Sequence, residues 1–153
     1  MAIERPADAR PADYAFRGFN ALIGHKVEFW RPGFVEMSLE VRPELCNASG
    51  IVHGGVLMTL LDSASGVACT FDEKAGTRRY SVTLAFTTQF LKAARSGDRL
   101  RILGAKRESP GRTTFFAETE ILDGSGALIA TGSGTFRYRA GERADGSLRL
   151  GAD

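Results

Sequence analysis

The chain has 153 residues, of which 43% are hydrophobic and 25% charged, so it has the size of one globular domain with one core. Its formal charge of +2 is too small to indicate nucleic-acid binding. Cys46 and Cys69 offer neither a metal-ligand quartet nor a disulfide framework, which favours the reducing cytoplasm. The chain shows neither a secretory signal nor an apolar stretch near the roughly 20 residues of a membrane span. We therefore expect a soluble, cytoplasmic protein without a metal site.

The two ends of the chain differ in composition from the rest. Both are rich in Gly, Pro and charged residues and show no apolar period. Such segments bury too little apolar surface to hold a fixed structure. We therefore expect flexible ends at residues 1–13 and 140–153, and one folded domain over residues 14–139.

The first half of this domain changes from a helical pattern to a strand pattern. Apolar residues between Asp13 and Gly24 recur at helical spacing, and the Asp13 side chain is suited to cap that helix. From Lys26 to Val41 the period is two, and Pro32-Gly33 divides the run into two strands. A turn-rich segment then leads into the longest helical pattern of the chain, residues 51–71.

Four strand-like runs follow the long helix and are separated by turn sequences. They are Tyr80 to Leu91, Arg99 to Glu108, Thr113 to Leu122 and Ala127 to Tyr138. Because strands and helices do not alternate, a doubly wound parallel sheet is disfavoured. The order predicts an α+β domain in which an antiparallel sheet wraps around one helix.

Asp62 is the one charged residue between His53 and Phe71. On a helical projection its neighbours are small or weakly polar, whereas the opposite and flanking faces are broadly apolar. Isolated buried carboxylates are costly without a partner, so they concentrate where chemistry uses them. The alternative is a structural role for Asp62, through a local hydrogen bond or an ion pair with an arginine.

The start of the same helix carries a second candidate site at His53, Gly54 and Gly55. A helix start leaves unsatisfied N–H groups at the positive end of the helix dipole, and glycines let a ligand approach them. Such donors would hold the oxyanion that forms when a carbonyl is attacked, although a glycine-assisted turn capped by His53 is an alternative. Asp62 follows Gly54 after about 12 Å of helix rise, so we expect a composite site between two chains.

The string NASGIVHGGVLMTLLDSA, residues 47–64, resembles the PaaI-like (phenylacetate-pathway) branch of the hot-dog thioesterases. That branch shows an Asn, a short gap, His-Gly-Gly and then an acid on the helix, and its later strands are also similar. The resemblance implies a hot-dog fold with a five- or six-stranded antiparallel sheet. It further implies an acyl-CoA thioesterase, active as a dimer or a dimer of dimers. No separate cofactor is implied, since coenzyme A is part of the substrate, nor is a nucleic-acid or membrane partner.

The resemblance also implies roles for residues of the long helix. Asp62 would be the catalytic carboxylate, either as a general base that activates water or as a nucleophile that attacks the thioester. Gly54 would supply the N–H of the oxyanion hole, with Gly55 allowing close approach. His53 would shape the helix start and bond to the substrate carbonyl.

Residues on either side of the helix complete the implied site. Asn47 would position water or the thioester, and Ser81 would orient the water. By strand alternation Ser81 shares a face with the odd-numbered residues up to Gln89, and that face is equally consistent with a solvated or tetramer-covered surface. Met58, Cys69 and Phe71 are candidates for the acyl pocket or for plain core. Basic residues in turns are candidates for the phosphates of coenzyme A, namely Arg78, Arg79, Lys106, Arg107 and Arg112.

Two other functions compete with hydrolysis. A hot-dog dehydratase or hydratase needs a catalytic His paired with an acid, but this chain has only His25 and His53 and lacks the His-Phe-Pro segment of the acyl-carrier dehydratases. A non-catalytic acyl-CoA-binding or regulatory module would have lost the acid, whereas Asp62 and Asn47 are both present. The order of residues favours a thioesterase. It leaves open the acyl group and the choice between coenzyme A and a carrier protein.

Overall fold

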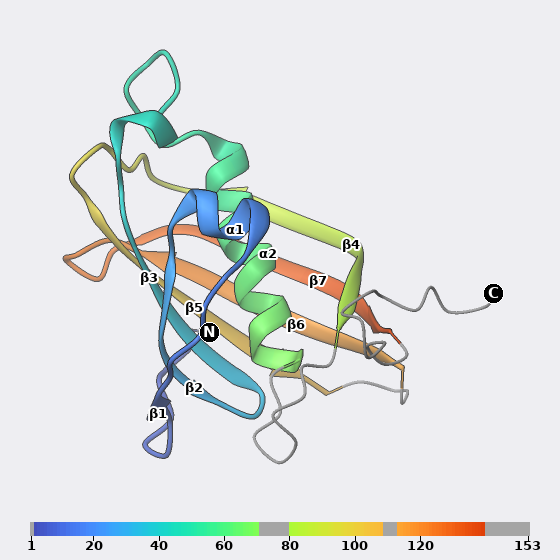
Figure 1. Ribbon diagram of the computed structural model, residues 1–153. Helices are drawn as coiled ribbons and strands as arrows, with labels where there is room; N and C mark the ends of the chain where they lie inside the picture. The colour runs from blue at the N-terminus through green and yellow to red at the C-terminus, as the bar shows by residue number, and fades with distance from the viewer. Residues whose placement is uncertain (1, 71–79, 109–112, 140–153) are drawn as a thin grey trace.

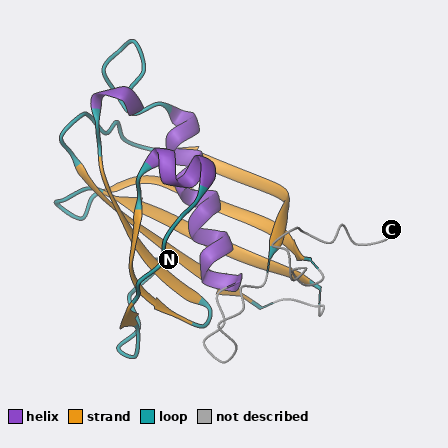
Figure 2. Cartoon of the chain, in the orientation of Figure 1, coloured by secondary structure: helices purple, strands orange, loops and turns teal. Residues whose placement is uncertain are grey.

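The computed structural model of the chain describes residues 2–70, 80–108 and 113–139. Within these ranges one antiparallel sheet curls around a long helix, α2 (Gly54–Thr70), as Figures 1 and 2 show. A short helix α1 (Gly18–Ile23) and a 3-10 turn η1 (Pro43–Leu45) complete the fold. The strands are β1 (Arg10–Pro11), β2 (Lys26–Arg31), β3 (Phe34–Glu40), β4 (Ser81–Phe90), β5 (Arg99–Arg107), β6 (Thr114–Leu122) and β7 (Leu128–Tyr138). Their order in the sheet is β1-β2-β3-β5-β6-β7-β4.

The α+β hot-dog fold predicted from the sequence is thus confirmed, and the six longer strands and α2 agree with the predicted elements within a few residues. The seventh strand, β1, is only two residues long and lies in the segment that we expected to be a flexible end. There the backbone of Arg10 and Pro11 pairs with Trp30 and Phe29 of β2.

The N-terminal segment packs across the outer face of the sheet, away from α2. Ile3 is buried with Phe34 and Leu103 in a small apolar cluster, and its N–H donates to Oε2 of Glu120 at 2.9 Å. The average composition of residues 1–13 does not reveal this packing, because one apolar residue over a matching apolar patch is enough to hold a short segment. The folded domain therefore begins before residue 14. Residues 140–153 lie outside the described ranges.

Helix α1 begins later than predicted. Its N-cap is Arg17, which makes no side-chain capping bond, and Asp13 lies outside the helix. The backbone N–H of Ala12 still donates to Glu28 of β2 at 3.2 Å, so the chain remains extended at the point where the helix was expected to start. The predicted end is confirmed, because Gly24 follows α1 with a φ of 87°, a conformation that favours glycine.

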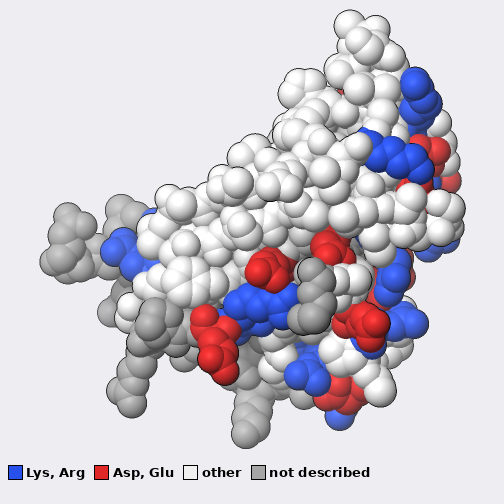
Figure 3. Space-filling model, turned by 180° about the vertical axis from the view of Figure 1, so that it is seen from behind, with Lys and Arg blue, Asp and Glu red and all other residues white. Residues whose placement is uncertain are grey.

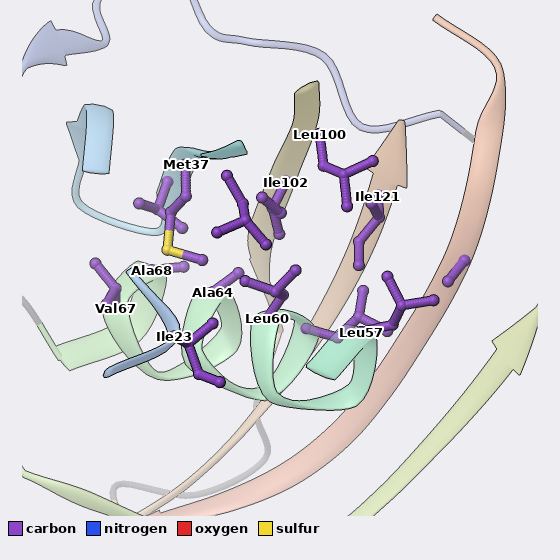
Figure 4. Close-up of a cluster of buried hydrophobic side chains, with 14 of the residues drawn as sticks. Ile23, Met37, Leu57, Leu60, Ala64, Val67, Ala68, Leu100, Ile102 and Ile121 are labelled. Carbon is purple, nitrogen blue, oxygen red and sulfur yellow. The ribbon is translucent and has the colours of Figure 1, made fainter. Parts of the chain in front are cut away.

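Helix α2 fills the concave side of the sheet with its apolar face (Figure 4). Leu57, Leu60 and Ala64 point toward Leu100, Ile102 and Ile121 of the sheet, and all six side chains are buried. Burial of each large aliphatic side chain contributes about 1.5–3 kcal/mol to the free energy of folding, so this contact holds the helix firmly against the strands. Within the described ranges no helix is long and apolar enough to cross a membrane.

The two faces of the sheet differ in character. The outer face carries ion pairs such as Glu36 with Arg101 at 2.8 Å, and Arg107 with Glu118 at 2.6 Å. In the view from behind, charged residues gather in the lower and right-hand parts, and a broad uncharged band crosses above them (Figure 3). Strand β4, which ends the sheet, has no charged residue in its ten positions.

Candidate active site

The start of α2 is held by the side chain of His53. The Gly55 N–H donates to Nδ1 of His53 at 2.9 Å, and the His53 carbonyl accepts from the N–H groups of Val56 and Leu57. Because Nδ1 is an acceptor here, the hydrogen-bond network assigns the ring proton of a neutral His53 to Nε2. The cap that the sequence offered as an alternative is therefore present. It leaves Nε2–H, on an exposed ring, available as a donor.

Gly54 presents an unused donor beside this cap. No hydrogen bond joins its N–H to any other residue in the described part of the chain. The ring of Phe90 flanks the glycine, since a Cβ at Gly54 would lie 3.5 Å from Cζ of that ring. Phe90 is 54% exposed, so the helix start combines a free N–H with an open aromatic surface. No sequence pattern points to Phe90, because only the fold brings the end of β4 to this point.

Asn47 shapes the loop that leads to the helix. Its Oδ1 accepts from the backbone N–H groups of Ser49 at 2.9 Å and Ile51 at 3.4 Å, and its own N–H donates to Ile51. This is the local hydrogen bonding by which Asn stabilises turns. The side-chain amide Nδ2 is not used in these bonds. Asn47 therefore has a structural role in this loop, and the role in positioning water or the thioester stays a prediction.

Asp62 lies half-buried two turns further along α2. Its Oδ1 accepts a hydrogen bond of 2.7 Å from the hydroxyl of Thr83 on β4. The ion pairs found among the described residues include none to Asp62, so the alternative of a structural Asp–Arg pair has no support there. The hydrogen bond of the other alternative is present, and its donor, Thr83, is not among the residues expected from the sequence.

The small or weakly polar residues that surround Asp62 on α2 differ in how deeply they are buried. Gly55 and Met58 are exposed on the N-terminal side, whereas Ser65 and Cys69 are buried on the C-terminal side. Burial raises the pKa of the Cys69 thiol to about 12, which keeps it protonated. Cys69 therefore belongs to the core, and Met58 is the candidate that remains open to a ligand.

A bulge in β4 decides which hydroxyls face α2. Thr83 pairs with Phe136 of β7, but two residues later Ala85 pairs with Thr135, so the register shifts at this point. Phe86 beyond the bulge packs on the core side, against Phe136 at a ring distance of 6.1 Å. The prediction that Ser81 shares a face with the odd-numbered residues up to Gln89 is wrong, because the extra residue reverses the alternation.

The two halves of β4 therefore line different surfaces. Ser81 and Thr83 lie on the side of α2, and the hydroxyl that bonds to Asp62 there is that of Thr83 rather than that of Ser81. Thr87 and Gln89 lie on the outer face, where they line a small polar cavity of about 230 Å³.

The candidate phosphate contacts divide into three groups. Arg107 lies on the outer face and forms its ion pair with Glu118 there, so the structure does not bring it to the start of α2. Lys106 donates to the hydroxyl of Tyr138 at 3.2 Å, and that hydroxyl donates to the carbonyl of Cys69 at 3.0 Å. The remaining candidates Arg78, Arg79 and Arg112, together with Phe71, lie outside the described residues. No cluster of three or more His, Cys, Asp or Glu suited to a metal occurs within the described ranges.

Comparisons with known proteins agree with this fold. A family model for the Thioesterase superfamily matches residues 49–130. Human acyl-coenzyme A thioesterase 13 is 31% identical over 105 residues, which cover 68% of this chain and 72% of that protein. The chain belongs to the thioesterase superfamily, and it is a thioester hydrolase.

Solved structures place it near the PaaI branch. A variant of the phenylacetic acid degradation protein PaaI from Thermus thermophilus matches with a TM-score of 0.68 and 28% identity, over 80% of this chain and 98% of that one. A Streptococcus mutans protein bound to acetyl CoA matches with a TM-score of 0.70 and 26% identity, over 84% and 96%. The resemblance to PaaI-like thioesterases found in the sequence is thereby confirmed.

Proposed function

We propose that the chain hydrolyses acyl-CoA thioesters at the start of α2. The observation that carries this proposal is the pair of open donors there, the Gly54 N–H and the Nε2–H of His53, beside an exposed aromatic ring. Relatives named for acyl-coenzyme A or bound to acetyl CoA support the choice of substrate.

In the proposed reaction the thioester carbonyl lies at the two donors and Asp62 promotes the attack. As a general base, Asp62 takes a proton from water while the water oxygen bonds to the carbonyl carbon. The Gly54 N–H and His53 Nε2–H stabilise the negative charge on the carbonyl oxygen. Collapse of this intermediate breaks the carbon–sulfur bond, and the thiolate of coenzyme A takes up the proton. In the nucleophilic alternative, Asp62 attacks the carbonyl carbon, the carbon–sulfur bond breaks and coenzyme A leaves as the thiolate. Water then cleaves the anhydride between Asp62 and the acyl group, which gives the free acid and restores the Asp62 carboxylate.

We further propose that the site is completed by a second copy of the chain. One α2 separates Gly54 from Asp62 by eight residues, about 12 Å of rise, so a carbonyl at one helix start is better placed for the carboxylate of another chain. The uncharged edge of β4 supports such pairing, because monomeric proteins usually protect long edge strands with charges.

The positions of the exposed apolar side chains also support pairing with a second copy of the chain. The large ones found in the described part of the chain all belong to α1, α2, β4 or the residue that follows β4. They are Phe19, Leu22, Met58, Leu84, Phe90 and Leu91. Because α1 and α2 lie on the concave side and β4 forms its edge, one partner would cover them together (Figure 1).

The proposed catalytic role of Asp62 is tested by steady-state hydrolysis of a panel of acyl-CoA thioesters. Asp62→Asn should lower kcat by at least about 100-fold, since the base or nucleophile is removed. Glu40→Gln, at an exposed carboxylate at the end of β3, is the matched control and should leave kcat unchanged. Wild-type turnover by Asp62→Asn on the best substrate would refute the mechanism. Carrier-protein thioesters in the same panel would, if preferred, replace coenzyme A as the substrate.

The shared site is tested by mixing inactive variants. Subunits that carry Asp62→Asn and subunits that carry Asn47→Ala should regain part of the activity when they are combined, because one of the two sites in a mixed dimer is then intact. Native mass spectrometry of the same samples reports whether mixed dimers form. Mixed dimers without any regained activity would contradict a site shared between chains.

A further inference from the structure

We propose that Phe86 of β4 limits the length of the acyl group that the site accepts. This inference rests on the proposed function and deepens it, because it concerns the acyl part of the substrate. Phe86 lies beyond the bulge of β4 on the side that faces α2, and its side chain is half-buried.

Phe86 lies between the two ends of the candidate site. The contact with Asp62 is made three residues earlier on β4, at Thr83. The contact with Gly54 is made four residues later, at Phe90. An acyl chain that starts at the Gly54 N–H and follows β4 reaches Phe86 after four residues of strand, about 13 Å, which is the length of a medium-chain acyl group. Because Phe86 is close to both ends, the same ring would border the acyl group in a site formed by one chain or by two.

The ring of Phe86 rests on two glycines of β7. A Cβ at Gly132 would lie 2.7 Å from Cζ of Phe86, and a Cβ at Gly134 would meet Cδ2 of the same ring even more closely. Neither glycine has a positive φ, so both are required for space rather than for an unusual backbone angle. Glycine weakens the interior of a strand and marks places where another group approaches the backbone closely. The two glycines thus leave room on the inner face of the sheet, and the Phe86 ring occupies it.

Only part of this ring is enclosed by the core. One edge packs against Phe136, with ring centroids 6.1 Å apart and planes at 69°, and Phe136 itself is buried. Phe86 is half-buried, so an acyl chain that follows β4 would meet the open part of its ring. Removal of the ring would give the chain the room above the two glycines. A methyl group on Gly132 would push the ring toward the chain, so the two changes should affect the accepted chain length in opposite directions.

The test measures kcat/KM of the full-length protein for straight-chain acyl-CoA thioesters from acetyl to hexadecanoyl. Phe86→Ala should raise kcat/KM for the longest thioesters, relative to that for medium-chain thioesters, by about 10-fold or more, because the opened room accepts further methylene groups. Gly132→Ala should lower kcat/KM for medium-chain thioesters, relative to that for acetyl-CoA, by about 10-fold. The three atoms nearest to the new Cβ belong to the side chains of Phe86 and Thr119, so side chains rather than the backbone give way.

Three further variants separate this role from a general effect on the core. The double variant Phe86→Ala/Gly132→Ala should recover the kcat/KM that Gly132→Ala loses for medium-chain thioesters, because the displaced ring is gone. Phe86→Leu keeps the core better filled and should shift the preference in the same direction as Phe86→Ala by a smaller factor. Phe116→Ala is the matched control, since it removes a half-buried ring that pairs with Arg107 on the outer face, and it should leave the preference unchanged.

A plain core residue would behave differently from a residue that limits chain length. If Phe86→Ala and Phe86→Leu changed kcat/KM equally for all chain lengths, the inference would be overturned. The same holds if Gly132→Ala shifted the preference toward longer chains, as Phe86→Ala should. In both cases, hydrolysis by the unaltered protein would leave the proposed function standing. No hydrolysis of any thioester in the series by the unaltered protein would instead refute the proposed function and, with it, this role of Phe86.

Discussion

Gly104 of β5 and Ala64 of α2 approach so closely that a Cβ at Gly104 would lie 2.7 Å from the Ala64 carbonyl oxygen. This contact sets the depth at which α2 sits in the sheet. Since α2 carries both Gly54 and Asp62, the same contact sets the position of the candidate site relative to β4. A glycine is required at this point for close approach rather than for an unusual backbone angle.

The first prediction follows from this contact. Gly104→Ala should destabilise the fold by about 1–3 kcal/mol, because the added methyl group must push a backbone carbonyl away. Chemical denaturation measures the change. Gly124→Ala is the control, since a Cβ there would be 4.0 Å from its nearest neighbour, and it should change stability by less than about 0.5 kcal/mol. Equal stability of both variants would show that α2 and β5 pack less closely at this point than the structure indicates.

The second prediction separates the two ring nitrogens of His53. His53→Asn keeps an acceptor near the position of Nδ1 and loses the donor at Nε2. It should therefore retain wild-type stability and lose about 10-fold or more in kcat, since a charge-stabilising donor is gone. His53→Gln should show the opposite pattern, with a loss of about 1 kcal/mol from the missing cap and a smaller loss of kcat. Thermal unfolding and steady-state kinetics give the two readouts, and matching behaviour of the two variants would contradict separate roles.

The third prediction concerns the aromatic surface next to Gly54. If Phe90 contacts the acyl group, Phe90→Ala should lower kcat/KM by about 10-fold for bulky apolar acyl thioesters and much less for an acetyl thioester. Leu91→Ala removes a similarly exposed apolar side chain from the next position and serves as the control. A uniform loss across the acyl series would point instead to a role of Phe90 in assembly.

The fourth prediction uses His25, whose buried ring packs against Phe16 at a centroid distance of 4.1 Å. Neither ring nitrogen has a hydrogen-bond partner within the described ranges, and burial lowers the pKa of His25 from its ordinary value of 6.5 to about 4. Between these two values the unfolded chain binds the proton and the folded chain does not. The stability contribution of neutral His25 is therefore complete above about pH 6.5 and is lost as the pH falls toward 4.

Chemical denaturation at two pH values tests the direction in which stability changes with pH. Stability should fall by about 2 kcal/mol between about pH 7.5 and about pH 5. His25→Phe removes the titrating group and keeps an apolar ring beside Phe16, so the decrease should become much smaller. If His25→Phe kept the same pH dependence of stability, other titratable groups would be its cause.

The sequence determined much of this protein because its signals are local. The periods of two and of about 3.6 located β2 to β7 and α2, and the turn sequences located their ends. Gly54 and Asp62 lie on one continuous helix and His53 directly precedes it, so their order could be read without any tertiary information. Gly24 likewise marked the end of α1, since its positive φ is a property of that residue type.

The tertiary structure alone decided which groups surround that helix. The pairing of β4 with β7 introduces the bulge, and the bulge turns Thr83 rather than Thr87 toward α2. The same pairing brings Phe90 to Gly54, which is 36 residues earlier in the chain. Strand alternation fails at such a point because a register shift is set by the partner strand, and a single sequence does not carry the register of its partner.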